Sequence, residues 1–359
     1  MRTIRGIPVL EKIPVLVRTA LNVPIANGEV ANDYRLRRAL PTIKFLAERG
    51  ARVILISHIG EHGTETLAPV AKALGNLLPR VSFFGETIGP RTRNAVRNLL
   101  PGHVLVLENL RRDRGEKMND PAFARELAAL ADVFVQDSFD TCHRAHSSIV
   151  GVPKLLPSYA GLLLEEEIRE LRKARSPKSP SLAIIGGAKF STKEAVLIEL
   201  LKTYNHVFVG GALADDFLKA SGKDVGGSLV SPEDNQKAIR RLLVNPKLVL
   251  PIDSVIEHDM ILDQGAGTNA LLDSLARKAK TILWNGPLGK YEEGFTVGTD
   301  AFAHSVAASG AHSIVGGGDT IAAIERLGLL SKFSFVSTGG GAMLNFLVDD
   351  TLIGITALG

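Results

Sequence analysis

Short apolar runs rich in β-branched residues alternate with amphipathic stretches of helical length along most of the chain. This alternation predicts repeated strand–helix units around parallel sheets, which are buried on both faces. A first series predicts strands at Pro14–Leu21, Val53–Ser57, Val81–Phe84, Val104–Leu107 and Val133–Gln136, separated by helices at Pro41–Arg49, Leu67–Leu78, Thr92–Leu100 and Pro121–Leu130. A second series predicts strands at Leu182–Ile185, His206–Val209, Leu248–Ile252, Thr281–Trp284, Ser313–Val315 and Phe333–Ser337, with helices between them.

A charged, amphipathic helical pattern separates the two series at Leu162–Arg175 and ends in Ser176-Pro177-Lys178-Ser179-Pro180. Such a segment is typical of a connector that enters a new domain. The length of 359 residues also fits two domains of about 150 residues each. We therefore predict an α/β protein of two lobes, residues 1–160 and 161–340. Each lobe is expected to be a parallel-sheet, Rossmann-like, three-layer αβα domain, and a helical hinge at about 162–175 is expected to join them.

The composition argues against a membrane-spanning, secreted or disulfide-stabilised protein. No segment is apolar enough over a sufficient length to cross a bilayer, and Met1-Arg2-Thr3-Ile4-Arg5-Gly6 lacks the apolar stretch of a secretion signal. The single cysteine, Cys142, excludes an internal disulfide and suits a reducing cytosol. We expect a soluble, cytoplasmic protein with no membrane partner.

Charge is unevenly distributed between the two halves of the chain. Residues 1–160 carry 22 Lys and Arg against 15 Asp and Glu, which gives +7, whereas residues 161–359 carry 20 against 23, which gives −3. The total of +4 is too small and too diffuse for a nucleic-acid-binding stripe, so no nucleic-acid partner is expected. The first half is either built to bind an anion or has only a basic, solvated surface.

Glycine-rich turns follow most of the strands predicted in the second series. In open α/β sheets, ligands bind where strands end, and glycine lets backbone amides approach a phosphate closely. A single turn of this kind indicates tight packing more often than a ligand, but five in one lobe predict a polyphosphate site. The five turns are Gly186-Gly187-Ala188-Lys189, Gly210-Gly211, Asn285-Gly286-Pro287, Gly316-Gly317-Gly318-Asp319-Thr320 and Ser337-Thr338-Gly339-Gly340-Gly341.

Neither of the two best-known phosphate-binding fingerprints is present. The sequence contains no G-x-x-x-x-G-K-[ST], and no G-x-G-x-x-G follows the first strand of either lobe, which disfavours hydride chemistry. Asp319 ends a glycine turn, where its carboxylate could hold Mg²⁺ or merely cap the following helix. Lys189 and Lys193 lie four residues apart, so both ammonium groups could face one phosphoryl group, unless they form only a surface pair.

The glycine-rich turns of the second lobe resemble signature segments of the phosphoglycerate kinase family and occur in the same order. The resemblance extends over nearly the whole chain. The first lobe adds Val17-Arg18, Asn22-Val23-Pro24, Leu40-Pro41-Thr42-Ile43, Ser57-His58-Ile59-Gly60, Leu107-Glu108-Asn109-Leu110-Arg111 and His143-Arg144-Ala145-His146-Ser147-Ser148. The resemblance implies an N-terminal lobe that binds 3-phosphoglycerate, a C-terminal lobe that binds MgATP or MgADP, and hinge closure. It also implies a C-terminal segment, residues 341–359, that returns to the N-terminal domain.

Functional residues follow from the resemblance by position. Lys189 is expected to stabilise the transferring phosphoryl group, with Arg18 and Lys193 as further catalytic residues, Glu292 at the ribose and Asp319 at the metal. The nucleotide-binding set is Lys193, Gly210, Gly211, Ile261, Asn285, Pro287, Glu292, Gly317, Gly318, Asp319 and Thr320. The acid-binding set is Arg18, Asn22, Arg35, His58, Arg111 and Arg144. Phosphoryl transfer needs no protein nucleophile, so Cys142 is not a catalytic candidate, although its basic, His-rich segment could lower its pKa.

Several positions depart from the family pattern on the acid side. Ala20 stands where an aspartate is expected, Glu61 replaces an arginine, Asp140 replaces a glycine, and Arg112 replaces an aromatic residue. Each charge-assisted bond lost to an anion would weaken binding roughly ten- to a hundredfold. Two compensations stay open: Arg112 for the guanidinium lost at Glu61, and Asp140 for the carboxylate lost at Ala20.

The nucleotide lobe departs from the pattern more mildly, at Asp215-Asp216, Gln264 and Ala266. The two aspartates either disfavour a nearby phosphate or face solvent, and we expect them to face solvent.

The resulting hypothesis is reversible phosphoryl transfer between 1,3-bisphosphoglycerate and ADP, giving 3-phosphoglycerate and ATP, by a glycolytic Mg²⁺-dependent kinase that acts as a monomer. Two alternatives stay open because of Ala20, Glu61 and Asp140. One is a kinase of this fold for a different carboxylic acid, and the other is a non-catalytic nucleotide-binding protein.

Overall fold

The computed structural model describes residues 1–232 and 235–359 and divides them into two compact units. Unit 1 comprises Met1–Ile168 and Thr351–Gly359, and unit 2 comprises Arg169–Asp350. The division falls within helix α6 (Leu162–Arg175), whose bounds are those predicted from its amphipathic pattern. Among the described residues, no helix has the length and apolarity that crossing a membrane requires.

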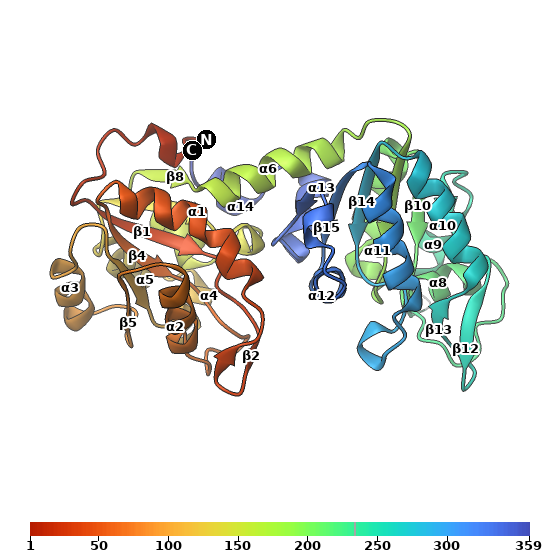
Figure 1. The fold of residues 1–359 in the computed structure, drawn as a ribbon, viewed down its shortest axis with the longest axis horizontal. Helices are drawn as coiled ribbons and strands as arrows, with labels where there is room; N and C mark the ends of the chain where they lie inside the picture. Colours follow the sequence, from red (N-terminus) through yellow and green to blue (C-terminus); the bar gives the residue numbers. More distant parts are fainter. Residues whose placement is uncertain (233–234) are drawn as a thin grey trace. The chain divides into compact units, whose positions relative to one another are not determined.

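Unit 1 is built on a six-stranded, fully parallel sheet with strand order β5-β6-β4-β1-β7-β8 (Figure 1). Its central strand β1 is buried at all six positions because helices cover both faces of the sheet. Five of the six strands were predicted, and β8, only three residues long, was missed. The strands are β1 (Pro14–Thr19), β4 (Arg52–Ile56), β5 (Val81–Phe84), β6 (Val104–Leu107), β7 (Val133–Asp137) and β8 (Ser158–Ala160).

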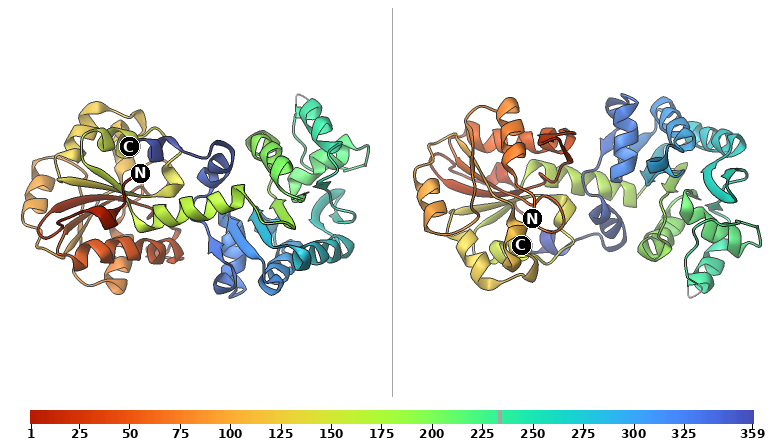
Figure 2. Two further views of the ribbon diagram at one scale, coloured as in Figure 1. Left: turned by 90° about the horizontal axis from the view of Figure 1, so that it is seen from above. Right: turned by 90° about the horizontal axis from the view of Figure 1, so that it is seen from below.

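The helices of unit 1 lie on both faces of this sheet, with α1 on one side and the segments around α4 and α5 on the other (Figure 2). Helix α1 begins seven residues before its predicted start, because Pro41 lies inside the helix rather than in its first turn. The side chains of Asp113 and Asp120 cap α4 and α5 by accepting backbone N–H bonds. The helices are α1 (Tyr34–Glu48), α2 (Ala68–Leu77), α3 (Pro90–Arg97), α4 (Arg114–Met118) and α5 (Pro121–Ala128), beside a small hairpin of β2 (Ile25–Ala26) and β3 (Glu29–Val30).

Unit 2 contains a second six-stranded parallel sheet, with strand order β11-β10-β9-β14-β15-β16. All six strands were predicted, with β11 and β16 shorter than expected. Both central strands, β9 and β14, are buried along their whole length. The strands are β9 (Ser181–Ile185), β10 (His206–Val209), β11 (Leu248–Val249), β14 (Thr281–Asn285), β15 (His312–Gly316) and β16 (Phe335–Val336).

Helices also cover both faces of the second sheet, so the prediction of two three-layer αβα domains is confirmed (Figure 2). An antiparallel hairpin of β12 (Ser254–Glu257) and β13 (Met260–Gln264), which was not predicted, adds one wall of the cavity described below. The helices are α7 (Glu194–Thr203), α8 (Ala212–Ala220), α9 (Gln236–Leu243), α10 (Ala266–Lys278), α11 (Val297–Ser309), α12 (Gly318–Arg326) and α13 (Gly341–Asp349).

The last residues of the chain belong to unit 1. Residues 351–359 include helix α14 (Ile353–Thr356), where the N–H of Gly354 donates to the carbonyl of Cys142 at 2.8 Å. At the other end, Thr3 forms a parallel bridge with Ala160. Residues 341–350, which the sequence groups with the N-terminal domain, fall in unit 2 instead, because α13 packs against α7.

Candidate active site

Four glycine-rich turns of unit 2 follow the adjacent strands β10, β9, β14 and β15, at one edge of the sheet. Backbone bonds tie these turns together: the N–H of Gly186 donates to the carbonyl of Asn285 at 2.8 Å, and that of Gly187 to the carbonyl of Pro287 at 3.2 Å. A Cβ on Gly186 would collide with the Pro287 carbonyl. Only glycine allows this close backbone approach, which leaves a concave edge of the kind that binds phosphates.

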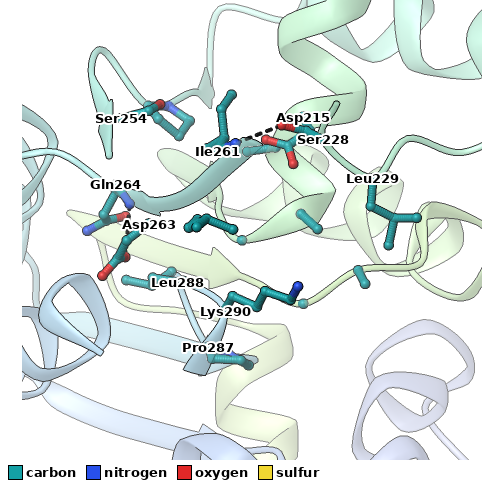
Figure 3. Close-up of a pocket in the computed structure, with 18 of the residues that line it drawn as sticks. Asp215, Ser228, Leu229, Ser254, Ile261, Asp263, Gln264, Pro287, Leu288 and Lys290 are labelled. Atoms are coloured by element: carbon teal, nitrogen blue, oxygen red, sulfur yellow. Dashed lines mark hydrogen bonds between the residues drawn. The ribbon is translucent and has the colours of Figure 1, made fainter. Parts of the chain in front are cut away.

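Beside these turns lies a cavity of about 420 Å³, formed entirely by residues of unit 2 (Figure 3). One wall is the glycine turns, with Gly187, Gly211 and Pro287, and the opposite wall is the β12–β13 hairpin. A mostly apolar cleft with a few polar groups at a strand-end edge is the usual form of a small-molecule site. Of the nucleotide-binding residues predicted from the sequence, the cavity is lined by Gly211, Ile261, Pro287, Glu292 and Asp319.

The remaining predicted nucleotide residues lie in the same turns, outside the cavity lining. Thr320 is buried, and its hydroxyl accepts the N–H of Gly286 at 3.0 Å, which links the turns after β14 and β15. The other members of this supporting group are Gly210, Asn285, Gly317 and Gly318, beside Lys193.

The two lysines predicted to act together differ in their surroundings. The ammonium of Lys193 donates to the carbonyl of Gly186 at 2.5 Å, and burial lowers the pKa of Lys193 to about 8. Lys189 is exposed, one turn earlier along the chain. Lys193 is therefore directed at the glycine turn itself, whereas Lys189 is open to a ligand at the surface.

Asp319 and Glu292 are exposed carboxylates on the rim of the cavity. Among the residues that the structure describes, no group of three or more His, Cys, Asp or Glu side chains could hold a metal ion. Mg²⁺ is usually bound by one or two carboxylates together with substrate phosphates, so a lone Asp319 fits Mg²⁺ that arrives with a nucleotide.

The prediction that Asp215 and Asp216 face solvent is wrong. Both side chains are buried on α8, which is enclosed at every position from Leu213 to Leu218. Asp216 accepts the N–H and the hydroxyl of Ser231, at 2.5 and 2.7 Å. Asp215 lines the cavity, and burial, reinforced by Asp216, raises the pKa of Asp215 to about 7.

Asp263 is a second buried carboxylate of the cavity that the sequence analysis missed. Its oxygens accept the N–H groups of Gly298 and Gln264, both at 2.9 Å, while burial raises its pKa. Asp263 therefore joins β13 to the start of α11 and fixes the wall of the cavity. Its position at the end of a short apolar run, Met260–Leu262, was the only sequence signal.

In unit 1, Arg18 lies at the end of β1 and is only 1% exposed. Its guanidinium donates to the carbonyl of Thr19 at 2.7 Å and to the hydroxyls of Ser148 and Ser138, both at 3.2 Å. Its Nη2 lies 2.9 Å from Nδ1 of His58. Arg18 therefore organises the ends of β1, β4 and β7 into one polar cluster.

His58 is held in its neutral form by this arrangement. A guanidinium can only donate, so Nδ1 of His58 accepts and the ring proton is on Nε2. Burial, together with the charges of Arg18 and Arg111, lowers the pKa of His58 well below its usual range. The buried Glu116 accepts from the hydroxyl of Ser148 at 2.6 Å, and its charge offsets that of Arg18.

Arg35 and Asn22 lie at the edge of the same cluster. Nη1 of Arg35 donates to the carbonyl of Asn22 at 3.0 Å and lies 3.5 Å from Oδ2 of Asp140. The other oxygen of Asp140 accepts the hydroxyl of Ser138 at 2.5 Å. The amide oxygen of Asn22 accepts the N–H of Gly60 at 3.1 Å. Asp140 therefore contributes a carboxylate to the basic cluster from the loop after β7.

Arg111 and Arg144 complete the set predicted for the acid. Nη1 of Arg111 donates to the carbonyl of Gly60 at 2.5 Å and lies 3.5 Å from the carboxylate of Glu61, which is 70% exposed. Arg144 is exposed on the loop after β7. The guanidinium of Arg112, the residue considered as a replacement for the arginine lost at Glu61, pairs with Glu108 at 3.0 Å.

Cys142 is buried beside this cluster, and its thiol donates to the carbonyl of Ser138 at 3.4 Å. Burial raises the pKa of Cys142, so the expectation that its basic neighbours could lower that pKa is wrong. Desolvation of a thiolate outweighs the attraction of Arg18 in this interior.

Comparison with known proteins identifies the family. The sequence profile of the family described as phosphoglycerate kinase matches residues 7–350. The chain belongs to the phosphoglycerate kinase family. A phosphoglycerate kinase of Moorella thermoacetica is 43% identical over 96% of this chain and 95% of its own length. One from Rubrobacter xylanophilus is 44% identical over 99% of this chain and 98% of its own.

Solved structures agree with this membership. Phosphoglycerate kinase from Coxiella burnetii superposes with a TM-score of 0.84 at 37% identity, covering 99% of this chain and 98% of that one. The enzyme from Pyrococcus horikoshii OT3 superposes with a TM-score of 0.91 at 29% identity, covering 100% of this chain and 98% of that one. Both the sequence and the fold thus place this chain in the phosphoglycerate kinase family.

Proposed function

We propose that this protein catalyses reversible phosphoryl transfer between 1,3-bisphosphoglycerate and ADP, giving 3-phosphoglycerate and ATP. The observation that carries the proposal is the concave edge of four glycine turns beside the cavity of unit 2, in a chain of this family. That edge suits a nucleoside polyphosphate. Unit 2, residues 169–350, would be the nucleotide-binding domain, and unit 1, residues 1–168 with 351–359, would be the acid-binding domain.

The nucleotide would lie with its phosphates at the glycine turns. Gly317 and Gly318 would leave room for the phosphates, and Lys193 would add positive charge beside Gly186. Gly210 and Gly211, at the start of α8, would border the rest of the nucleotide. Glu292 would bind the ribose, with Ile261, Asn285, Pro287 and Thr320 shaping the site. Asp319 would hold Mg²⁺, which when bound supplies charge neutralisation for the nucleotide oxygens.

The acid would bind at the basic cluster of unit 1, through Arg18, Asn22, Arg35, His58, Arg111 and Arg144. Two changes in this chain act in opposite directions. Glu61 faces Arg111 and reduces the attraction of the cluster for an anion. Asp140 pairs with Arg35, and its carboxylate would substitute for the one that is missing at Ala20. The net charge of the cluster still favours a small phosphorylated acid.

Lys189 would stabilise the phosphoryl group in transit. Phosphoryl transfer depends on positioning and charge neutralisation rather than on a covalent intermediate, and the exposed ammonium of Lys189 stands at the glycine turn after β9. Loss of one such donor typically lowers kcat by about a hundred- to a thousandfold. We propose that the enzyme works as a monomer in the cytoplasm, in keeping with its buried, unpaired Cys142.

The test is ATP consumption with 3-phosphoglycerate and Mg²⁺, coupled to reduction of the acyl phosphate product, for the wild type and Lys189→Ala. The control is Lys278→Ala, which removes another exposed lysine of unit 2 from the far end of α10. We expect saturable turnover that falls about a hundredfold or more only in Lys189→Ala. If ADP binds but no turnover occurs with millimolar 3-phosphoglycerate, the proposal fails. Turnover with another carboxylic acid would then identify an altered acceptor.

A further inference from the structure

One carboxyl group of the cavity, that of Asp215, has an oxygen without a hydrogen-bond partner among the described residues. Asp215 lies in the first turn of α8, is 1% exposed, and lines the cavity. Its Oδ1 has no hydrogen-bond partner among the residues that the structure describes. Its neighbour Asp216 is satisfied by Ser231, so the two adjacent acids serve different purposes.

Burying a carboxyl oxygen without a partner costs free energy, and a native protein rarely leaves one unsatisfied without reason. The cost at Asp215 shows in its raised pKa of about 7, which burial causes and Asp216 increases. An unsatisfied acceptor that lines a ligand cavity would be satisfied by a donor on the ligand.

The surroundings of Asp215 indicate which part of a nucleotide would reach it. Leu218, Leu229 and Met260 line the cavity with it, and they form an apolar environment for a flat aromatic ring. Figure 3 shows Asp215 beside Ser228 and Ile261, whereas Pro287, from the glycine turn after β14, lies at the opposite side of the cavity. A carboxylate would repel a phosphate, so the phosphates belong at the glycine turn after β15, where Asp319 lies, and not beside the first turn of α8. The base then belongs near Asp215.

We propose that Asp215 selects the nucleobase by accepting a hydrogen bond from an N–H donor on the purine edge, namely the exocyclic amino group of adenine. This inference rests on the proposed function, because it takes the cavity as the nucleotide site. A site built to hydrogen-bond a ligand N–H rejects the analogue that lacks it, since the buried acceptor is then left without a partner. Asp215 therefore makes the pocket selective for a base, in addition to binding its ring.

The test compares ADP with purine riboside 5′-diphosphate, which lacks only the amino group, by isothermal titration calorimetry in the presence of Mg²⁺. The wild type is expected to bind ADP about ten- to a hundredfold more tightly, the usual value of one bond to a charged or buried group. Asp215→Leu, which keeps the volume but has no acceptor, is expected to bring the ratio of the two dissociation constants close to one. Asp215→Asn retains an acceptor oxygen and is expected to restore most of the preference.

Ser254→Ala is the matched control, since it removes a polar side chain from the β12 wall of the same cavity. Its ratio is expected to equal that of the wild type. If Asp215→Leu does not fold, as judged by circular dichroism, Asp215→Ala takes its place. A wild-type ratio near one, or the same ratio in the wild type and in the Leu or Ala variant, overturns the inference. Normal phosphoglycerate-dependent turnover in that case would show that only the inference fails, whereas no binding of ADP would show that the proposed function fails.

Discussion

Asp137, at the end of β7, provides a quantitative test of how unit 1 is stabilised. Its Oδ1 accepts the N–H groups of Leu163 and Leu164, at 3.0 and 3.2 Å, and so caps the start of α6. The carboxyl is fully buried, and burial raises its pKa from 3.8 to about 7 despite these bonds. The protonated form therefore predominates in the folded protein at mildly acidic pH, whereas the unfolded chain has lost the proton.

The sign and size of the effect follow from this difference. A carboxyl whose folded pKa is raised stabilises the fold below its unfolded pKa, and this contribution is lost as the pH rises through about 7. At about 1.36 kcal/mol per pKa unit, the whole contribution is roughly 4 kcal/mol. About 3 kcal/mol of it would be lost between pH 5 and pH 8.5. Asp137→Asn keeps the accepting oxygen but cannot ionise, so it should not lose this stability.

The single tryptophan, Trp284, lies in unit 2, so its fluorescence does not report on this part of the fold. Hydrogen exchange measured by mass spectrometry on peptides covering residues 133–164 does. We expect the opening free energy of Asp137→Asn, relative to wild type at the same pH, to rise by about 3 kcal/mol from pH 5 to pH 8.5. Asp120→Asn, which alters the more exposed cap of α5, is the control and should show no such rise. Parallel pH profiles for wild type and Asp137→Asn would refute the reasoning.

Two further predictions concern the candidate site. Glu61→Gln removes the exposed carboxylate beside Arg111, so the KM for 3-phosphoglycerate should fall by up to about fivefold, the range of a surface ion pair. The control Glu29→Gln, which breaks a surface pair with Lys72, should leave this KM unchanged. If steady-state kinetics show the same KM for Glu61→Gln and wild type, Glu61 does not act on the bound acid. Because burial lowers the pKa of Lys193 to about 8, ADP affinity measured by calorimetry should decline as the pH rises from 7 to about 9.5. Lys193→Arg stays charged over that range and should remove the decline, so equal pH profiles would argue against contact between Lys193 and the phosphates.

The sequence predicted most of the fold because the buried strands carry unbroken apolar runs. The central strands, such as β1 and β14, are buried on both faces, so almost all of their residues are apolar and the strands are easily recognised in the sequence. Strand β8 is only three residues long and was missed. The hairpin β12–β13 was missed because Val255 and Ile256 of β12 face solvent. Short or solvent-exposed strands bury too few side chains to produce a recognisable alternation of apolar and polar residues in the sequence.

The site was predictable where glycine turns follow strands, and unpredictable where charge is buried. Asp215 and Asp216 are adjacent acids on a helix, which ordinarily face solvent, but α8 is enclosed on several sides by its neighbours. Asp137 follows the last predicted residue of its strand, and nothing in the sequence reveals that its oxygen caps a helix twenty-six residues later. Such tertiary hydrogen bonds depend on which elements pack against each other in the fold. The local pattern of residues does not contain that information.

The membership of residues 351–359 in unit 1 bears on the order of events during synthesis. Leu352 and Leu358 are buried, and a Cβ on Gly354 would collide with Ile149 and Cys142, so this segment packs tightly into the interior of unit 1. Its codons are translated only after all of unit 2 has been made. A nascent chain that stops before residue 351 can bury the complete apolar core of unit 2 but not that of unit 1. The unit that begins the chain is therefore the last for which all residues have been synthesised.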